Sequence, residues 1–338
     1  MTSPCRATSA RFLRSLLLRG LFIPGLLSLL ACSVNPPLEL AEVTGSDQAV
    51  HLDVPFYPQE EFQCGPAALA GVLVNAGVDT DPAVLKDQVY IPERQGSLQL
   101  EMLAATRRAG RIAYQPGPEP RQLFAQLEAG IPVLVMQNLR TPHFPAWHYA
   151  VLVGFDAEAG EVLLNSGTER GMRMRARSFM RSWEWADRWA LVALQPGQLP
   201  AMPDGDRLFE ALAAFQASAG AAAAEPAWRS AAEAMPAEPR FALALGNIAY
   251  AADQHEEALR QYRRGLVLDP GHPALLNNLA SVLWELGCEE EAQASVNTAL
   301  NALDGDSPWR DILEETRAEG GATAVQSERG DCAALAGM

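Results

Sequence analysis

The chain has 338 residues, and 20% of them are charged, with a formal net charge of −15. Residues 1–31 hold four of the 26 basic side chains and no acidic one, so the remainder carries 22 basic against 41 acidic residues. This excess of negative charge, with no basic stripe, excludes nucleic-acid binding as an expected function. The length exceeds the roughly 100–200 residues of one average domain, so we expect two domains.

Residues 1–31 are typical of a signal peptide. Four arginines precede an apolar stretch from Leu21 to Leu30, which is too short to cross a hydrocarbon core about 30 Å thick. The stretch ends in Leu-Leu-Ala-Cys, which resembles the lipobox of bacterial lipoprotein precursors and implies lipidation of Cys32. Ser33 then favours the outer membrane. We therefore expect a lipid-anchored protein at the periplasmic face of the bacterial cell envelope, with residues 32–48 as a tether. The alternative is an ordinary signal peptide that happens to carry a cysteine.

Three cysteines remain beyond the signal peptide and the lipidation site: Cys64, Cys288 and Cys332. Their number is odd and their spacing is not that of a disulfide framework, so one of them is expected to be a reactive thiol. Cys64 is the candidate. Cys332 lies in the small, polar segment 316–338, which we predict to be disordered, and is interpreted as a tail thiol without function.

Residues 49–195 combine helical and strand patterns. The predicted helices are 65–76 and 98–109, and the predicted strands are 50–54, 132–136, 149–155, 162–164 and 189–194. A helix followed by an antiparallel sheet indicates an α+β domain. The proline- and glycine-bearing residues 196–205 then predict a linker.

Residues 206–315 show similarity to themselves at a constant step along the chain. The pairs that keep this step are Leu245 and Leu279, Gly246 and Ala280, Ala258 and Ala292, Tyr262 and Val296, and Pro236 and Pro270. Small residues at fixed places let paired helices approach closely, and proline ends the second helix. The pattern resembles the tetratricopeptide repeat, whose period is about 34 residues, and this implies an all-α domain of about three repeats that binds a protein partner. An alanine-rich bundle without repeat geometry is the alternative.

The chemistry-bearing residues are a cysteine, a histidine and an asparagine. Cys64 directly precedes an apolar helix, whose free N–H groups and dipole favour a thiolate. Gly65 would let a substrate backbone approach. His148 heads an apolar strand, and Asn165 ends the strand that follows it, from which its carbonyl could orient the imidazole.

The run Gln-Cys-Gly-Pro-Ala-Ala-Leu at 63–69, with His-Tyr-Ala-Val at 148–151, resembles the bacteriocin-processing cysteine peptidases (cysteine peptidase family 39), which belong to the papain clan. The resemblance covers residues 50–195. It implies a papain-like fold, with Cys64 as nucleophile, His148 as general base and then acid, and Asn165 as orienting group. A glutamine upstream of the cysteine supplies an oxyanion donor, beside the Cys64 N–H. Family members usually carry aspartate as the orienting residue and place the glutamine six residues before the cysteine; here Gln59 stands five before it.

The sequence thus predicts a papain-like α+β cysteine peptidase domain followed by an all-α tetratricopeptide-repeat domain. Its partners are a peptide or protein substrate, a protein bound by the repeats, and the membrane. No cofactor is implied, and no ligand spacing indicates a metal site. Nothing after residue 200 supplies the membrane spans or phosphate loop of the transporter members, so their double-glycine leader substrate is not expected. Two alternatives stay open: an inactive domain that serves as a peptide-binding scaffold, and a cell-wall amidase or transferase with the same triad.

Overall fold

The structure is a computed structural model that describes residues 40–45, 47–58, 63–324 and 332. These residues fall within one unit, Leu38–Met338. The predicted signal peptide, the lipidation site Cys32 and the oxyanion glutamine Gln59 lie outside the described residues. None of the helices in the described ranges is both apolar and long enough for a membrane span.

A seven-stranded antiparallel sheet forms the centre of the first domain, with strand order β4-β9-β5-β6-β7-β8 and with β1 paired to β6. The strands are β1 (Ala49–His51), β4 (Ile112–Tyr114), β5 (Val133–Asn138), β6 (Trp147–Asp156), β7 (Glu161–Ser166), β8 (Glu169–Arg175) and β9 (Ala190–Leu194). A two-stranded sheet, β2 (Tyr90–Ile91) with β3 (Gly96–Ser97), lies apart from it. The predicted α+β class is therefore confirmed.

The long strand β6 pairs with three other strands of this sheet, β1, β5 and β7. Its first half pairs with β5, and its second half pairs with β1. Where β1 pairs with β6, a Cβ atom added at Gly154 would lie 2.1 Å from the carbonyl oxygen of Val50 and would collide with it. Glycine is therefore required there.

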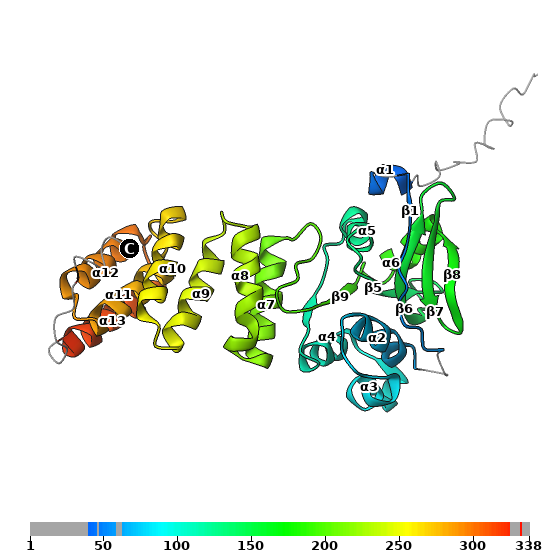
Figure 1. The fold of residues 1–338 in the computed structure, drawn as a ribbon, viewed down its shortest axis with the longest axis horizontal. Helices are drawn as coiled ribbons and strands as arrows, with labels where there is room; N and C mark the ends of the chain where they lie inside the picture. Colours follow the sequence, from blue (N-terminus) through cyan, green and yellow to red (C-terminus); the bar gives the residue numbers. More distant parts are fainter. Residues whose placement is uncertain (1–39, 46, 59–62, 325–331, 333–338) are drawn as a thin grey trace, which may run out of the picture. The chain divides into compact units, whose positions relative to one another are not determined.

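Helices cover both faces of the sheet, and Figure 1 shows α2, α3 and α4 together. They are α1 (Leu40–Thr44), α2 (Cys64–Asn75), α3 (Pro82–Val89), α4 (Gln99–Arg108), α5 (Pro120–Glu128) and α6 (Ala176–Glu184), with a 3-10 turn η1 at Pro92–Arg94. On β6, Tyr149 and Val151 pack into the cluster that contains α2, whereas Ala150 and Leu152 pack into the cluster that contains α5 and α6. This is the alternation of a strand, and we call the two sides the α2 face and the α6 face.

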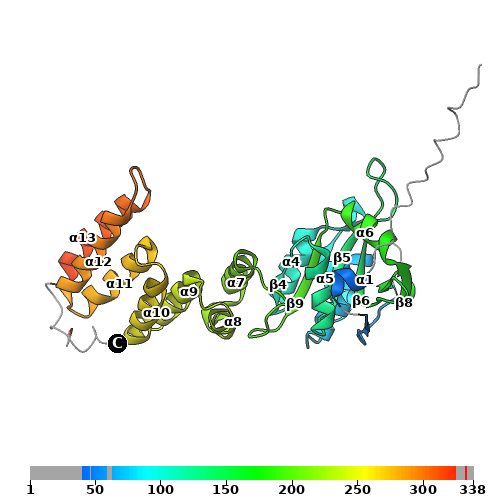
Figure 2. The ribbon, with the colours of Figure 1, turned by 90° about the horizontal axis from the view of Figure 1, so that it is seen from above.

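The second domain consists of paired helices that follow one another along the chain (Figure 2). They are α7 (Gly205–Ala219), α8 (Ala221–Ala234), α9 (Pro239–Ala251), α10 (His255–Leu268), α11 (Pro273–Glu285), α12 (Glu289–Ala302) and α13 (Trp309–Ala324). The helices α7, α9 and α11 start at equal steps along the chain, and so do α8, α10 and α12, with the same step in both series. The period found in the sequence is thus a period of helix pairs, while their assignment as tetratricopeptide repeats stays a prediction.

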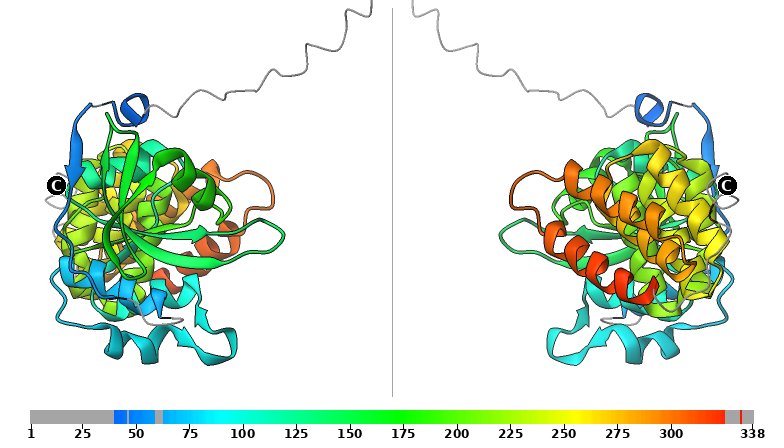
Figure 3. Two further views of the ribbon diagram at one scale, coloured as in Figure 1. Left: turned by 90° about the vertical axis from the view of Figure 1, so that its right-hand side faces the viewer. Right: turned by 90° about the vertical axis from the view of Figure 1, so that its left-hand side faces the viewer.

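Two predicted segments are more ordered than expected. In the predicted tether, residues Leu40–Thr44 form α1, and Leu40 is fully buried. The predicted disordered tail begins inside α13, which packs against α11 and α12 and is drawn in red in Figure 3. There Gly320 lies against the ring of Trp284, 2.1 Å from the position of an added Cβ, so the helix is held by close packing.

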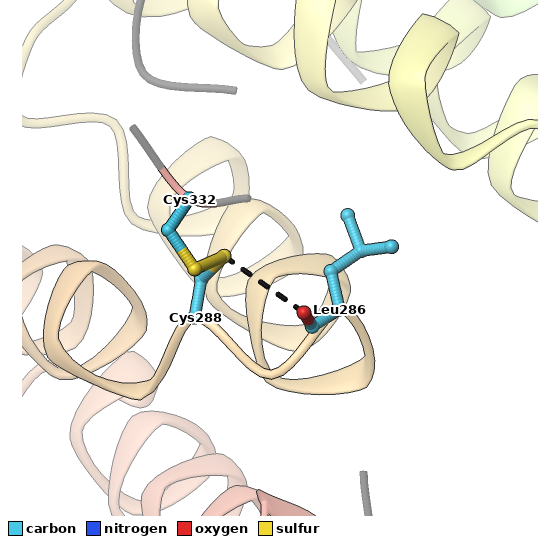
Figure 4. Close-up of a disulfide and its surroundings, with 3 residues drawn as sticks. All are labelled: Leu286, Cys288 and Cys332. Carbon is cyan, nitrogen blue, oxygen red and sulfur yellow. Dashed lines mark hydrogen bonds between the residues drawn. A yellow bond between two sulfur atoms is a disulfide. The ribbon is translucent and has the colours of Figure 1, made fainter. Parts of the chain in front are cut away.

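The interpretation of Cys332 as a free tail thiol is wrong. It forms a disulfide with Cys288 across 44 residues of chain, with a Cα–Cα distance of 5.6 Å (Figure 4). Cys288 lies between α11 and α12 and is buried, and its sulfur approaches the Leu286 carbonyl oxygen at 3.9 Å. Sequence reasoning missed the bond because two cysteines joined over a long separation leave no local pattern.

Candidate active site

The helix α2 begins at Cys64 itself. Pro66 occupies the first turn, where its missing N–H does no harm, and the small and aliphatic residues that follow are buried against the sheet. No side chain caps this end of the helix. Cys64 is the free cysteine of the described residues, and it is half-buried.

The sulfur of Cys64 lies among backbone N–H groups. Burial raises the pKa of the thiol, and the nearby backbone N–H groups of Tyr149, Gly65 and Cys64 itself lower that pKa in part. The net direction is upward, because desolvation of the thiolate outweighs the donors. The helix terminus therefore contributes as predicted, but it does not by itself make Cys64 a thiolate.

Gly65 serves a different purpose from the predicted one. A Cβ at this position would lie 2.3 Å from the Ser97 hydroxyl oxygen, so the space beside Gly65 is filled by the end of β3. The carbonyl of Ser97 in turn accepts a hydrogen bond from the Tyr149 hydroxyl at 3.3 Å. These contacts fix the start of α2 against β3 and β6.

His148 is the second residue of β6, and Tyr149, whose N–H reaches the Cys64 sulfur, follows it directly. The Nε2 atom of the imidazole lies 2.9 Å from the hydroxyl of Ser166. Burial lowers the pKa of the ring, since the charged form loses water. Within the part of the chain that the structure describes, the hydrogen bond of the ring is the one at Nε2, and Nδ1 has no hydrogen-bond partner.

The structure does not bring Asn165 to the imidazole, and this corrects the predicted triad. Asn165 pairs with Val151 across β6 and β7, which places its side chain on the α2 face. Its amide donates to the Val54 carbonyl at 3.4 Å and accepts from the Gly171 N–H at 3.0 Å. Consecutive residues of a strand point to opposite faces, so Ser166, one residue later, takes the predicted place.

Gln137 is a neighbour of the ring that the sequence did not indicate. It pairs with His148 across β5 and β6 and is fully buried on the α6 face, where its amide donates to the Ser182 hydroxyl at 2.7 Å. Its Oε1 atom has no hydrogen-bond partner in the described part of the chain. A glutamine at the end of an apolar strand was the available signal.

Within the described ranges, the group whose geometry suits a metal ion is Cys288, Glu291 and Cys332. Two of these three are joined in the disulfide, which leaves a single carboxylate donor. It lies in the helical domain, and none of its members belongs to the peptidase site.

Comparison with protein families decides what this first domain is. Residues 51–190 match the model described as the Peptidase_C39 like family. The first domain is a C39-like peptidase domain. The matched range begins in β1 and ends in β9, so it includes Cys64, His148 and Ser166. A comparison with curated proteins gave no match.

Solved structures similar to the C39-like domain include a C39-like peptidase from Bacillus anthracis, at 18% identity and TM-score 0.37, over 44% of this chain and 98% of that one. Another is a double glycine motif protease from a transporter, in complex with its leader peptide, at 24% identity and TM-score 0.34, over 43% and 93% of the two chains. A type III secretion chaperone from Yersinia enterocolitica, in complex with a translocator peptide, matches at 20% identity and TM-score 0.33, over 36% and 94%.

Proposed function

We propose that this protein is a cysteine peptidase of the bacterial cell envelope that cleaves peptide bonds through a thioester on Cys64. The observation that carries the proposal is that the Cys64 sulfur is near the backbone N–H of Tyr149, the residue that follows His148, within a C39-like peptidase domain. A nucleophile at a helix start, next to a histidine oriented by a third group, is the arrangement that acyl transfer needs.

In the first half of the reaction, His148 Nδ1 takes the thiol proton as the sulfur attacks the carbonyl carbon of the scissile bond. Both groups are neutral at rest, because burial raises the pKa of the thiol and lowers that of the ring. Proton transfer therefore accompanies attack. The oxyanion is held by the Cys64 N–H and by Gln59, which keeps its predicted role as part of the proposal.

In the second half, the imidazolium gives its proton to the nitrogen of the leaving amine, and the peptide bond breaks to leave the thioester. A water molecule then attacks the thioester while His148 accepts one of its protons. The acid is released and the proton returns to the Cys64 sulfur. The protons and electrons of these steps balance without a cofactor.

Export and anchoring complete the proposal. Lipidation at Cys32 would hold the protein at the periplasmic face of the outer membrane, and residues 205–324 would recruit the substrate or a partner protein. The disulfide between Cys288 and Cys332 supports an oxidising compartment, since disulfides persist there and are rare in a reducing cytosol.

One observation favours a second function, that of a peptide-binding scaffold. A buried thiol with a raised pKa beside a ring with a lowered pKa has a small population of the reactive ion pair. A domain that only binds peptides would show the same state.

Hydrolysis separates the two functions. Wild type, Cys64→Ala and His148→Ala, purified as full chains in detergent, are incubated with a random peptide library, and the products are identified by mass spectrometry. We expect cleavage by wild type alone, with both variants lowered at least about 100-fold, the usual contribution of a general base. Peptides bound equally by all three proteins and cut by none would identify the scaffold instead.

A further inference from the structure

We propose that Ser166 is the positioning residue of His148: its hydroxyl accepts the Nε2 proton and leaves the Nδ1 lone pair free for the Cys64 thiol. The inference rests on the proposed function. It differs from the sequence-based expectation, which gave this role to Asn165. A serine orients the ring without bringing a negative charge to it.

The contact between Ser166 and His148 lies in a buried and paired part of the sheet. Ser166 is 8% exposed, ends β7 and pairs with Glu169 of β8. Its hydroxyl lies 2.9 Å from Nε2, a distance typical of a good hydrogen bond. Leu164, two residues earlier on β7, packs into the cluster of the α6 face. The strand pairing fixes the side of the sheet to which the Cβ atom of Ser166 points, and the hydrogen bond to the ring sets the position of its hydroxyl.

The ring has a neutral amide as its neighbour on β5. Gln137 lies opposite His148 on β5, and its amide is held by Ser182 of α6. Among the described residues, no aspartate or glutamate forms an ion pair with His148. The charged and titratable residues of the elements around the ring are Cys64 of α2, Tyr149 and Asp156 of β6, Glu161 of β7, Glu169, Arg170, Arg173 and Arg175 of β8, and Arg177, Arg181 and Glu184 of α6.

The absence of a carboxylate partner of the ring among the described residues has a chemical consequence. A carboxylate would stabilise the imidazolium and hence a resting thiolate, whereas a hydroxyl fixes only the tautomer and the orientation. The hydrogen bond from Nε2–H to Ser166 keeps the proton off Nδ1. Ser166 therefore makes His148 a base that is ready at neutral pH, and proton transfer waits for a substrate.

The test compares Ser166→Ala, Ser166→Thr and Ser166→Asp with wild type in the full chain, together with Thr168→Ala as an exposed control in the same hairpin. The first readout is the titration of His148 by NMR, and the second is the rate of alkylation of Cys64 by iodoacetamide as a function of pH. Neither readout requires peptidase activity. If Ser166→Asp does not fold, as judged by circular dichroism, Ser166→Asn takes its place and is compared by its alkylation rate.

We expect Ser166→Ala to alkylate about tenfold more slowly than wild type near neutral pH, which is the effect of losing one hydrogen bond, and Ser166→Thr to restore the rate. Ser166→Asp should raise the pKa of the ring and increase the alkylation rate at pH 6 by about tenfold. Unchanged rates in Ser166→Ala and an unchanged ring pKa in Ser166→Asp would overturn the inference. These shifts in a protein that cleaves no peptide would refute the peptidase function while supporting the role of Ser166 as the partner of the ring.

Discussion

The amide of Asn165 joins two backbone segments that lie far apart in the sequence. It binds the Val54 carbonyl, 111 residues away, and the Gly171 N–H. The Asn165 side chain is buried, with 5% of its surface exposed. Its removal would therefore leave both backbone groups buried and without a hydrogen-bond partner.

Asn165→Ala should therefore lower the free energy of unfolding by about 1–3 kcal/mol, the effect of buried groups left unsatisfied. Urea denaturation followed by circular dichroism measures it. Thr168→Ala, in the exposed turn nearby, should stay within about 0.5 kcal/mol of wild type. A stable Asn165→Ala variant with an altered titration of His148 would instead return Asn165 to the role first predicted for it.

Burial of His148 makes the stability of the fold depend on pH. The folded-state pKa of the ring lies below its ordinary value of 6.5, so below that pH the unfolded chain binds a proton that the folded chain does not. The resulting stability is present above about pH 6.5 and is lost as the pH falls toward the folded-state pKa.

The comparison of wild type with His148→Gln isolates this effect. Between about pH 7.5 and pH 5.5, the unfolding free energy of wild type should fall more than that of the variant. The exposed His143→Gln is the matched control and should follow wild type. Parallel curves for wild type and His148→Gln would show that the ring is not buried in its neutral form.

Sequence reasoning predicted Cys64 and His148 as site residues because each has a local signature, a cysteine before an apolar helix and a histidine before an apolar strand. It predicted Asn165 as the orienting residue and did not consider Ser166, the polar residue next to it at the end of the same strand. The register that separates them shifts between Leu164 and Ser166, and such a bulge has no signature in a single sequence.

At the scale of elements, the close packing of helix pairs rests on small residues. A Cβ at Gly246 of α9 would lie 2.2 Å from the ring of Tyr262 on α10. The hydroxyl of Tyr262 donates to Asn247 at 2.9 Å, so the ring has little room to move.

Gly246→Ala should consequently destabilise the helical domain by about 1–3 kcal/mol through overpacking, although alanine is the better helix former. Thermal unfolding measures this effect. Asn297→Ala, at an exposed position of α12, is the control and should change stability by less than about 0.5 kcal/mol. A gain in stability from Gly246→Ala would mean that the two helices are not in close contact.

The disulfide holds residue 332 to the junction of α11 and α12. The two cysteines are separated by 44 positions in the sequence. For a loop of this size, loss of the cross-link should lower the free energy of unfolding by at most about 4 kcal/mol. We expect Cys332→Ser to unfold at lower denaturant concentration than wild type. Addition of a reductant should shift the denaturation curve of wild type to that of the variant and leave the curve of the variant unchanged. If the reductant did not change the curve of wild type, the disulfide would be absent.

The repeat period was visible in the sequence because it acts through side chains at fixed steps, and the helix starts follow it. The strand β8 was missed, although its Met172 and Met174 alternate with arginines. Three arginines obscured the apolar pattern. The second half of α13, beyond the predicted end of the helical domain at residue 315, was missed because its small and polar composition gives no sign of the contact between Gly320 and Trp284.

At the scale of the whole described molecule, the two domains share a core. A single cluster of buried residues includes Tyr114 and Leu123 as well as Leu208 and Phe215 of α7. The predicted linker 196–205 is also tied down.

Two contacts hold this linker. Gln126 both donates to and accepts from the backbone of Ala201, and the Tyr114 hydroxyl accepts the N–H of Asp204 at 3.2 Å. Proline and glycine predicted a domain boundary here, but composition carries no information about which side chains meet at that boundary.

The central claim is that Cys64 reacts as a nucleophile through His148. Its most direct measurement is the rate at which a peptidyl electrophile, such as a peptidyl epoxide, labels the full chain, with the modified residue located by mass spectrometry. We predict labelling of Cys64 in wild type, slowed at least about 100-fold in His148→Gln and unchanged in His143→Gln. Equal labelling rates in wild type and His148→Gln, or no labelling of Cys64 at all, would contradict the account.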